Sequence, residues 1–274
     1  MNVNIYYFSG TKNTFKVAET LRSELEVLGA NALLFNLEHH PSFTPADSLV
    51  IAYPVWGFGA PKIVTDFVKS LPNGNAKTYF VKTSGEPLGL NNASSMGLAK
   101  VLDKKGYIVA GEYHYVMPYN MVFRHDDLLA SKMLKVAKER IKTSASDIYA
   151  GMVKPLSFPL YARIMRTVCS IEHVGMRLNG NLYSVKKSEC IGCNKCLNNC
   201  PTKNISIKNG QYRFGNNCLG CARCAFSCPT NAINTGLLNF LKVNGPYDFS
   251  LSGDNAPIPK YCKSSYERYF MIEK

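Results

Sequence analysis

The sequence predicts an α/β protein in two parts, a doubly wound five-stranded parallel sheet followed by a small, cysteine-rich α+β domain. Short β-rich runs alternate with amphipathic helical stretches through the first half, as they do in βαβ units. All ten cysteines lie after residue 168. The charge changes at about the same place, from 16 basic and 13 acidic residues in 1–150 to 16 basic and 6 acidic residues in 151–274.

The strands and helices of the first half follow from hydrophobic periodicity. Five β-rich runs predict strands at Ile5–Phe8, Ala32–Phe35, Leu49–Tyr53, Thr78–Val81 and Tyr107–Met117. The first helix is indicated by apolar residues three or four apart: Phe15, Ala18, Leu21, Leu25 and Leu28. Asn13 or Thr14 is expected to cap its start, and Gly29 to end it. Further helices are expected at Ile63–Leu71, Ala93–Lys104 and Asp127–Ile141.

Length and composition describe an ordinary folded protein of about two domains. The 274 residues are 46% hydrophobic and 19% charged, which excludes a disordered tail, a collagen-like rod and a coiled coil. No apolar run approaches the roughly 18 residues that span a bilayer. A strand begins at Val3, which leaves no room for a signal peptide, so a cytoplasmic location is expected. Because charge and cysteine content change together, we place a domain boundary near 145–185.

The loops that follow the strands are the candidate binding site, since doubly wound sheets bind ligands at the carboxyl ends of their strands. The loop after the first strand offers hydroxyls, an amide and backbone N–H groups at a helix start, which suits a phosphate group as well as a simple helix cap. Its candidate residues are Ser9, Gly10, Thr11, Lys12, Asn13 and Thr14.

Two further loops complete this candidate site. The loop after the third strand contains the only Trp of the chain, which either stacks on a flat heterocycle or anchors the loop in the core. Its candidates are Pro54, Val55, Trp56 and Gly57. The loop Thr83–Pro87, after the fourth strand, supplies backbone donors for a ring edge, and its candidates are Thr83, Ser84 and Gly85.

These three loops resemble those of flavodoxin over about residues 3–145. The resemblance implies that residues 9–14 bind the phosphate of FMN and that segments 53–59 and 83–87 border its ring. In one departure, Lys12 stands where the family often has glycine, which adds a cation but strains the backbone if a positive φ is needed. A nicotinamide site is not supported, because Gly57–Gly59 lacks the third glycine of a dinucleotide fingerprint and follows the wrong strand.

Eight cysteines form two copies of the pattern C-x2-C-x2-C-x3-C-P, beginning at Cys190 and Cys218. This is the bacterial-type ferredoxin run, in which the fourth cysteine of each run binds the other cluster. Two 4Fe-4S clusters are therefore predicted. The ligands of cluster one are Cys190, Cys193, Cys196 and Cys228, and those of cluster two are Cys218, Cys221, Cys224 and Cys200.

Other roles for the cysteines are less consistent with the sequence. A disulfide framework does not suit a cytoplasmic protein, and zinc sites usually show no duplicated third cysteine with Cys-Pro. Cys169 lies in a stretch with apolar residues at helical spacing (Leu160, Ile164, Val168 and Ile171) and is expected to be a buried small hydrophobe.

As a whole, the chain resembles bacterial and archaeal fusions of a flavodoxin-like domain with a two-cluster ferredoxin domain. The expected divisions are 1–145 for the first domain, 146–185 for a helical connector, 186–240 for the ferredoxin domain and 241–274 for a tail that packs on the body. Met117–Asn120 also looks like a segment of that family that reaches the flavin.

The resemblance implies electron transfer between FMN and the two clusters in anaerobic redox metabolism, with no residue needed as an acid, base or nucleophile. An alternative is a flavin-dependent reductase of a small substrate that the clusters supply with electrons. The basic second half predicts docking of an acidic redox protein. A nucleic-acid-binding module is disfavoured, because the basic residues do not cluster and no nucleic-acid motif is present.

Overall fold

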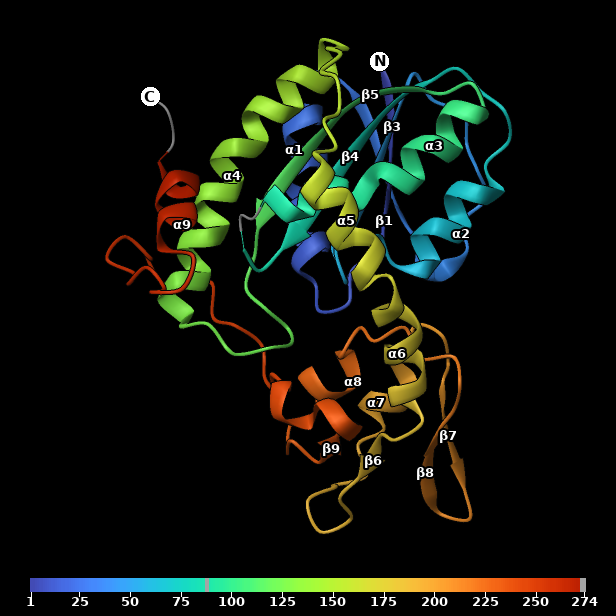
Figure 1. The fold of residues 1–274 in the computed structure, drawn as a ribbon, viewed down its shortest axis with the longest axis vertical. Coiled ribbons are helices and arrows are strands. Elements are labelled where there is room, and N and C mark those ends of the chain that lie inside the picture. Colours follow the sequence, from blue (N-terminus) through green and yellow to red (C-terminus); the bar gives the residue numbers. More distant parts are fainter. Residues whose placement is uncertain (87–88, 272–274) are drawn as a thin grey trace.

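The computed structural model describes residues 1–86 and 89–271, and its first half is a parallel sheet of five strands (Figure 1). The strands are β1 (Asn2–Tyr7), β2 (Asn31–Asn36), β3 (Ser48–Pro54), β4 (Lys77–Ser84) and β5 (Ile108–Val116). They are ordered β2-β1-β3-β4-β5, and each neighbouring pair is parallel. This is the strand order of flavodoxin-like sheets, so the predicted fold class is confirmed.

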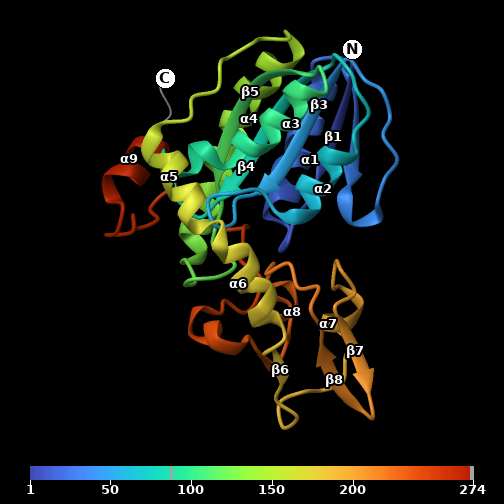
Figure 2. The same ribbon diagram turned by 45° about the vertical axis from the view of Figure 1, so that its right-hand side comes forward.

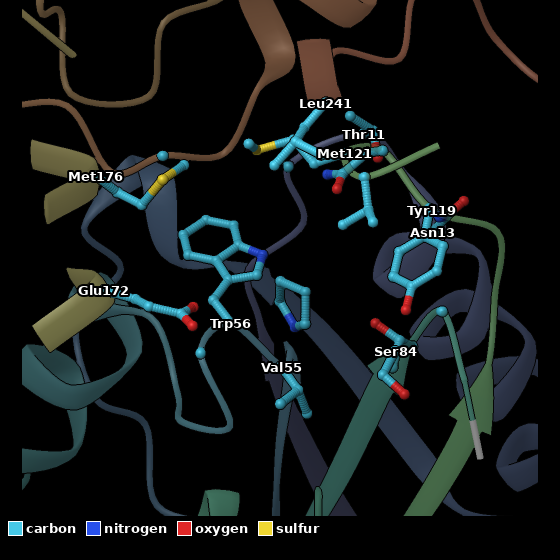
Figure 3. Close-up of a pocket in the computed structure, with 18 of the residues that line it drawn as sticks. Thr11, Asn13, Val55, Trp56, Ser84, Tyr119, Met121, Glu172, Met176 and Leu241 are labelled. Atoms are coloured by element: carbon cyan, nitrogen blue, oxygen red, sulfur yellow. The ribbon is translucent and has the colours of Figure 1, made fainter. Parts of the chain in front are cut away.

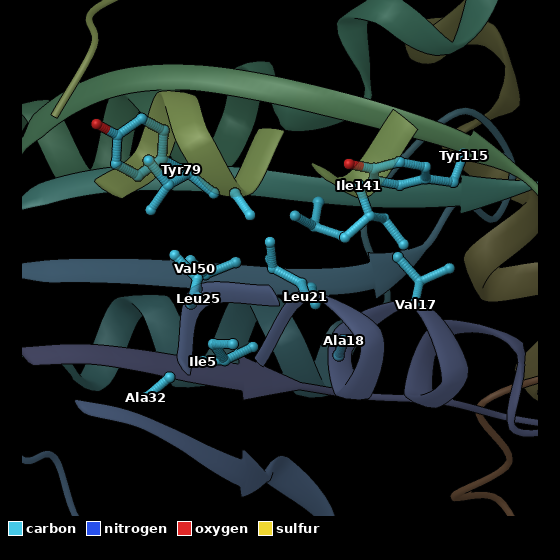
Figure 4. Packing of buried hydrophobic residues seen from close by; sticks show 14 of the residues in the cluster. Ile5, Val17, Ala18, Leu21, Leu25, Ala32, Val50, Tyr79, Tyr115 and Ile141 are labelled. Atoms are coloured by element: carbon cyan, nitrogen blue, oxygen red, sulfur yellow. The ribbon is translucent and has the colours of Figure 1, made fainter. Parts of the chain in front are cut away.

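Helices cover both faces of the sheet. Successive residues of a strand point to opposite faces, so Ile5 and Val50 pack under α1 (Asn13–Val27) and α4 (Asp127–Tyr149), as Figure 4 shows for Leu21 and Ile141. The neighbouring strand residues pack on the other face against α2 (Lys62–Ser70) and α3 (Met96–Lys104). The central strands β1, β3 and β4 are therefore buried on both sides, which explains their apolar sequences, whereas Leu33 of the edge strand β2 is 44% exposed.

The start of α1 differs from the prediction. The residue in the N-cap position is Lys12, whose side chain makes no capping hydrogen bond, and not Asn13 or Thr14. The side chains of these two residues are bonded elsewhere, because Asn13 Nδ2 donates to the Pro118 carbonyl (2.7 Å) and Thr14 Oγ1 lies 2.8 Å from Thr83 Oγ1. The start of α1 is thereby tied to the end of β4 and to the segment after β5.

Two helix boundaries also differ. The helix expected at Ala93–Lys104 begins as the 3-10 helix η2 (Gly89–Ser95), and only Met96–Lys104 is α-helical. Helix α4 continues past Ile141 to Tyr149, because its buried stripe goes on through Ala145 and Ile148. A further 3-10 helix, η1 (Leu37–His39), follows β2.

The second half lies at the carboxyl ends of the strands (Figures 1 and 2). Two consecutive helices, α5 (Leu160–Cys169) and α6 (Ile171–Gly180), lead from the sheet to two small antiparallel sheets. One pairs β6 (Ser184–Val185) with β9 (Ile233–Asn234), and the other pairs β7 (Ile205–Lys208) with β8 (Gln211–Phe214). Short helices α7 (Lys195–Asn198) and α8 (Arg223–Phe226) and the 3-10 helix η3 (Gly236–Leu241) complete this region.

The apolar spacing along α5 and into the start of α6 does not mark a buried face. Leu160, Ile164, Val168 and Ile171, which we call the apolar stripe, are 69%, 53%, 63% and 72% exposed. Helix α5 packs against η2 and buries Ala162 instead, and Cys169 is half-buried rather than buried. The prediction that Cys169 is a buried small hydrophobe was therefore wrong, because periodicity identifies an apolar face but not the side on which it packs.

This exposure leads to a stability prediction. Ile164→Lys is expected to change the free energy of unfolding by less than about 0.5 kcal/mol, since lysine suits an exposed helix position. Leu21→Ala, in the fully buried core, is expected to cost about 2–5 kcal/mol. Chemical denaturation of the two variants measures both values. A loss for Ile164→Lys as large as that for Leu21→Ala would show that the stripe is covered in solution.

The C-terminal segment packs against the flavodoxin-like half. Helix α9 (Lys263–Phe270) buries Tyr266 and Tyr269 against Leu129 and Met133 of α4. The Tyr269 hydroxyl accepts a hydrogen bond from the backbone N–H of Val116, the last residue of β5 (2.9 Å), and so ties α9 to the sheet.

In the part of the chain that the structure describes, no helix is long and apolar enough to cross a bilayer.

Candidate functional site

A cavity of about 650 Å³ lies where the carboxyl ends of β1, β3 and β4 face the second half of the chain; we call it the interdomain cavity. Twelve of the thirteen residues predicted from the three loops line it, and Lys12 does not. Pro87, at the end of the third loop, lies outside the described residues. The structure thus brings the three loops together, whereas binding of FMN by them remains a prediction.

The loop after β1 has the properties of a phosphate site. Ser9 Oγ is buried and has no hydrogen-bond partner among the described residues. The first N–H groups of α1 lack helical acceptors, and the first turn of α1 holds no acidic side chain that would compete for them. An anion at this helix start would satisfy the hydroxyl and the N–H groups together, so the residues present fit a phosphate group.

Lys12 adopts the left-handed conformation, with φ of 71°. This is the region in which glycine is favoured, so the strain expected from the departure at this position is present. Lys12 is exposed, and its side chain does not line the cavity.

Lys12→Gly is accordingly expected to raise the free energy of unfolding of the flavin-free protein by about 1 kcal/mol, because glycine adopts this conformation without a Cβ clash. Lys100→Gly, in the middle of α3 and exposed, is the matched control and is expected to lower it by about 1 kcal/mol. Chemical denaturation of both variants gives the two signs. A loss of stability in Lys12→Gly would contradict the strain argument.

Aromatic side chains border the interdomain cavity. Trp56 and Tyr119 lie on opposite sides of it (Figure 3). Trp56 also packs edge-on against Phe8, with ring centroids 5.6 Å apart, so it anchors its loop and lines the cavity at once. Tyr119 belongs to Met117–Asn120, all of which lines the cavity after β5. Two aromatic faces across a cavity suit a flat conjugated ligand.

A chain of hydrogen bonds connects the loop after β4 to the C-terminal segment and to the segment after β5. The Tyr119 N–H donates to His125 Nδ1 (3.2 Å), so Nε2 carries the proton and points at the Tyr261 hydroxyl (3.1 Å). The Tyr261 hydroxyl lies 2.8 Å from the Tyr266 hydroxyl, which donates to the Gly85 carbonyl (2.5 Å). Burial lowers the pKa of His125 to about 4, so the ring is neutral near pH 7.

This part of the site was not predicted from the sequence. The tail aromatics were expected only to pack on the body, and no local pattern links them to Gly85, which lies 181 positions away from Tyr266. The structure also explains why position 85 is a glycine, because a Cβ there would collide with the ring of Tyr119.

The far wall of the cavity comes from the second half of the chain. Helix α6 contributes Glu172, Gly175, Met176 and Asn179, and η3 contributes Leu237, Leu238 and Leu241. Leu219 and Gly220, which stand between the first two cysteines of the second run, also line it. The sequence analysis did not predict these residues as part of the site, because it treated the two domains separately, whereas the cavity is lined by residues of both.

The second cysteine run touches the candidate phosphate loop. A Cβ at Gly10 would lie 3.0 Å from the Cys221 carbonyl oxygen and 3.3 Å from Cys221 Cβ. Asn120 Nδ2 donates to the same carbonyl (3.4 Å). Gly10 therefore permits close approach of the two backbones as well as lining the cavity.

Arg223 joins the two halves beside this contact. Its guanidinium donates to the Ser9 and Gly10 carbonyls, each at 2.6 Å, and forms an ion pair with Glu38 through both nitrogens of its fork. The side chains of Arg223 and Glu38 are only 18% and 14% exposed. A mostly buried, bidentate pair of this kind neutralises the two charges and also fixes the orientation of the two side chains.

The cysteines gather in two sets. Cys190, Cys193, Cys196 and Cys228 border one small cavity with Tyr212 and Ile233. Cys200 lies with the second run instead. Burial raises the pKa of the Cys218 thiol, and the nearby Cys200 raises it further. Each set thus draws three cysteines from one run and one from the other, although iron ligation by these sets remains a prediction.

The charge of the buried thiols fits iron. Burial raises the pKa of the Cys221 thiol to about 12, so without a cation it would stay protonated and uncharged near pH 7. An iron cluster binds the thiolate and compensates its charge.

Within residues 1–86 and 89–271, no three His, Cys, Asp or Glu side chains stand close enough to hold a single metal ion.

Comparison with known proteins agrees with this organisation. Residues 189–232, which include all eight cysteines of the two runs, match the family model of the 4Fe-4S dicluster domain. Two 4Fe-4S clusters are thereby supported. No curated protein matches the chain.

Several solved structures are similar to about half of this chain. A Streptococcus pneumoniae flavodoxin is 16% identical, with a TM-score of 0.41, and the alignment covers 56% of this chain and 100% of that one. Flavodoxin 1 of Bacillus cereus is 14% identical (TM-score 0.39; 56% and 100% covered). An NAD(P)H:quinone oxidoreductase of Methanothermobacter marburgensis is 13% identical (TM-score 0.38; 54% and 96% covered).

The assignment of the first half depends on its strand order, and that of the second half on its cysteine runs and the family model. The chain joins a flavodoxin-like α/β domain to a 4Fe-4S dicluster domain, an organisation that indicates a role in electron transfer.

Proposed function

We propose that the chain passes electrons between FMN, bound in the interdomain cavity, and two 4Fe-4S clusters, and so links two-electron donors to one-electron carriers. When bound, FMN exchanges two electrons together or one at a time, whereas a 4Fe-4S cluster carries one. The chain's own residues set where these groups lie and what surrounds them.

One observation carries the proposal: the same cavity is lined by the candidate phosphate loop and by the loop of the second cysteine run. Leu219 and Gly220 belong to that loop, and the Cys221 carbonyl lies 3.0 Å from the Cβ position of Gly10. A flavin held by residues 9–14 would therefore lie beside the ligands predicted for cluster two. A short separation is what electron transfer within one chain requires.

The residues around the cavity supply binding and shielding. Ser9 and the first turn of α1 would hold the phosphate, and Trp56 and Tyr119 would border the ring. Met176, Leu219 and Leu241 provide apolar walls that exclude water from the space between the two domains. Exposed Cys193, a predicted ligand of cluster one, supports an anaerobic setting, since solvent-accessible clusters are open to oxygen.

The test is an anaerobic preparation in which iron, sulfide and flavin are quantified in one sample. We expect about eight iron, about eight sulfide and one FMN per chain. A flash that reduces the flavin should then produce reduced-cluster signals in electron paramagnetic resonance within the same molecule, at a rate independent of protein concentration. Clusters without flavin, or bound flavin that never reduces them, would refute the proposal. Repeated oxidation of the reduced protein by a quinone or nitro compound would favour the reductase alternative.

A further inference from the structure

The two cysteine sets are not equivalent in their distance from the flavodoxin-like domain. The second run contacts that domain through Cys221 and Arg223, whose partners include Gly10 and Ser9. Cys221 is buried. A cluster bound by the second set would thus lie at the domain junction, covered by the flavodoxin-like domain on the side of Cys221.

The first set lies at the opposite end. The loop after β6, which carries the start of the first run, lies with the β7–β8 hairpin at the end of the molecule farthest from the parallel sheet (Figures 1 and 2). Cys193 in this loop is exposed, and Ile191 beside it is 67% exposed. A cluster bound by the first set would therefore be covered only thinly on its outer side.

The surface around this end is basic. Lys187 and Lys195 are exposed and form no ion pair among the described residues, and Lys186 pairs with Glu189 at 3.2 Å. Glu189 is the only acidic residue in 186–243, against eight basic ones. Two oxidised clusters with their thiolates would cancel about four of these seven net positive charges, so the surface stays positive.

We propose that Ile191, Lys187 and Lys195 form the docking surface for an acidic one-electron carrier protein, and that cluster one is the point of electron exchange with it. This inference rests on the proposed function and adds the place and the partner. In each encounter one electron moves between the partner and this chain, so that one protein is oxidised and the other reduced by one electron. Exposed isoleucine among positive charges is typical of a transient contact, in which charge steers the encounter and a small apolar centre holds it.

The test measures binding to an acidic plant-type 2Fe-2S ferredoxin used as probe. The docking variant is Lys187→Glu with Lys195→Glu. The matched control is Lys69→Glu with Lys104→Glu, which changes the net charge equally on exposed helix positions of the flavodoxin-like domain. Iron content and visible spectra verify that both variants retain their clusters.

With both proteins oxidised, calorimetric titration at low salt is expected to show a Kd raised at least tenfold in the docking variant and less than about twofold in the control. The rate of electron transfer from the reduced probe should fall in parallel, and the wild-type rate should fall with added salt. Equal weakening in both variants, or unchanged binding in the docking variant, would overturn the inference.

A separate readout distinguishes failure of this inference from failure of the proposed function. Flash reduction of the flavin reports internal transfer, which the docking variant should leave unchanged. If internal transfer is present and the docking variant binds normally, only the docking surface is wrong. If internal transfer is absent, the proposed function is wrong, whatever the binding shows.

Discussion

Cys200→Ala is expected to remove cluster two, the cluster beside the interdomain cavity, although Cys200 belongs to the first cysteine run. The reason is the crossed grouping of the thiols, in which Cys200 lies with Cys218, Cys221 and Cys224. Iron content should fall from about eight to about four atoms per chain. Flash reduction of the flavin should then give no reduced-cluster signal, because the remaining cluster lies at the far end of the domain.

Cys228→Ala is the matched control, since Cys228 occupies the same position in the second run. It borders the cavity formed by Cys190, Cys193 and Cys196, so its loss should remove cluster one instead. Iron content should fall equally, but transfer from the flavin to the remaining cluster should persist. Transfer that survives in Cys200→Ala and is lost in Cys228→Ala would show that each run binds its own cluster.

The sequence was sufficient for those parts of the structure that depend on local patterns. Strands such as β3 are buried on both faces and read as unbroken apolar runs, and cysteine spacing is set by the shape of one loop around one cluster. The candidate loops were found because parallel strands end at one edge, which brings Ser9, Trp56 and Ser84 to one cavity.

What the sequence did not predict depends on contacts between distant segments. Nothing near Tyr266 indicates that its hydroxyl reaches Gly85, and nothing near Arg223 indicates Glu38, which lies 185 positions earlier. The apolar stripe on α5 and the start of α6 shows the converse, since its residues have helical spacing but the side on which α5 packs depends on its contact with η2. The positive φ of Lys12 is likewise not indicated by lysine itself, which rarely adopts this conformation.

Arg223→Met tests whether the contact between the domains depends on this long-range pair. The variant leaves Glu38 mostly buried without its partner and removes the bonds to the Ser9 and Gly10 carbonyls. Loss of one member of a buried pair costs about 3 kcal/mol, which corresponds to roughly a hundredfold shift away from the docked arrangement of the domains. Transfer from the flavin to the clusters should slow, at most about a hundredfold and by less the more the docked arrangement predominates in the wild type, while iron and flavin content stay unchanged.

Two further variants separate the causes of this loss. Lys62→Met removes a cation from an exposed pair, whose side chains are 67% and 53% exposed, and should leave the transfer rate unchanged. The double variant Arg223→Met with Glu38→Gln removes the unpaired carboxylate as well. If it restores most of the rate, the penalty came from the buried charge, and the packing of Cys221 on Gly10 is enough to dock the domains. If it restores nothing, the guanidinium bonds to the Ser9 and Gly10 carbonyls position the second cysteine run against the phosphate loop, and Arg223 is a positioning residue for electron transfer.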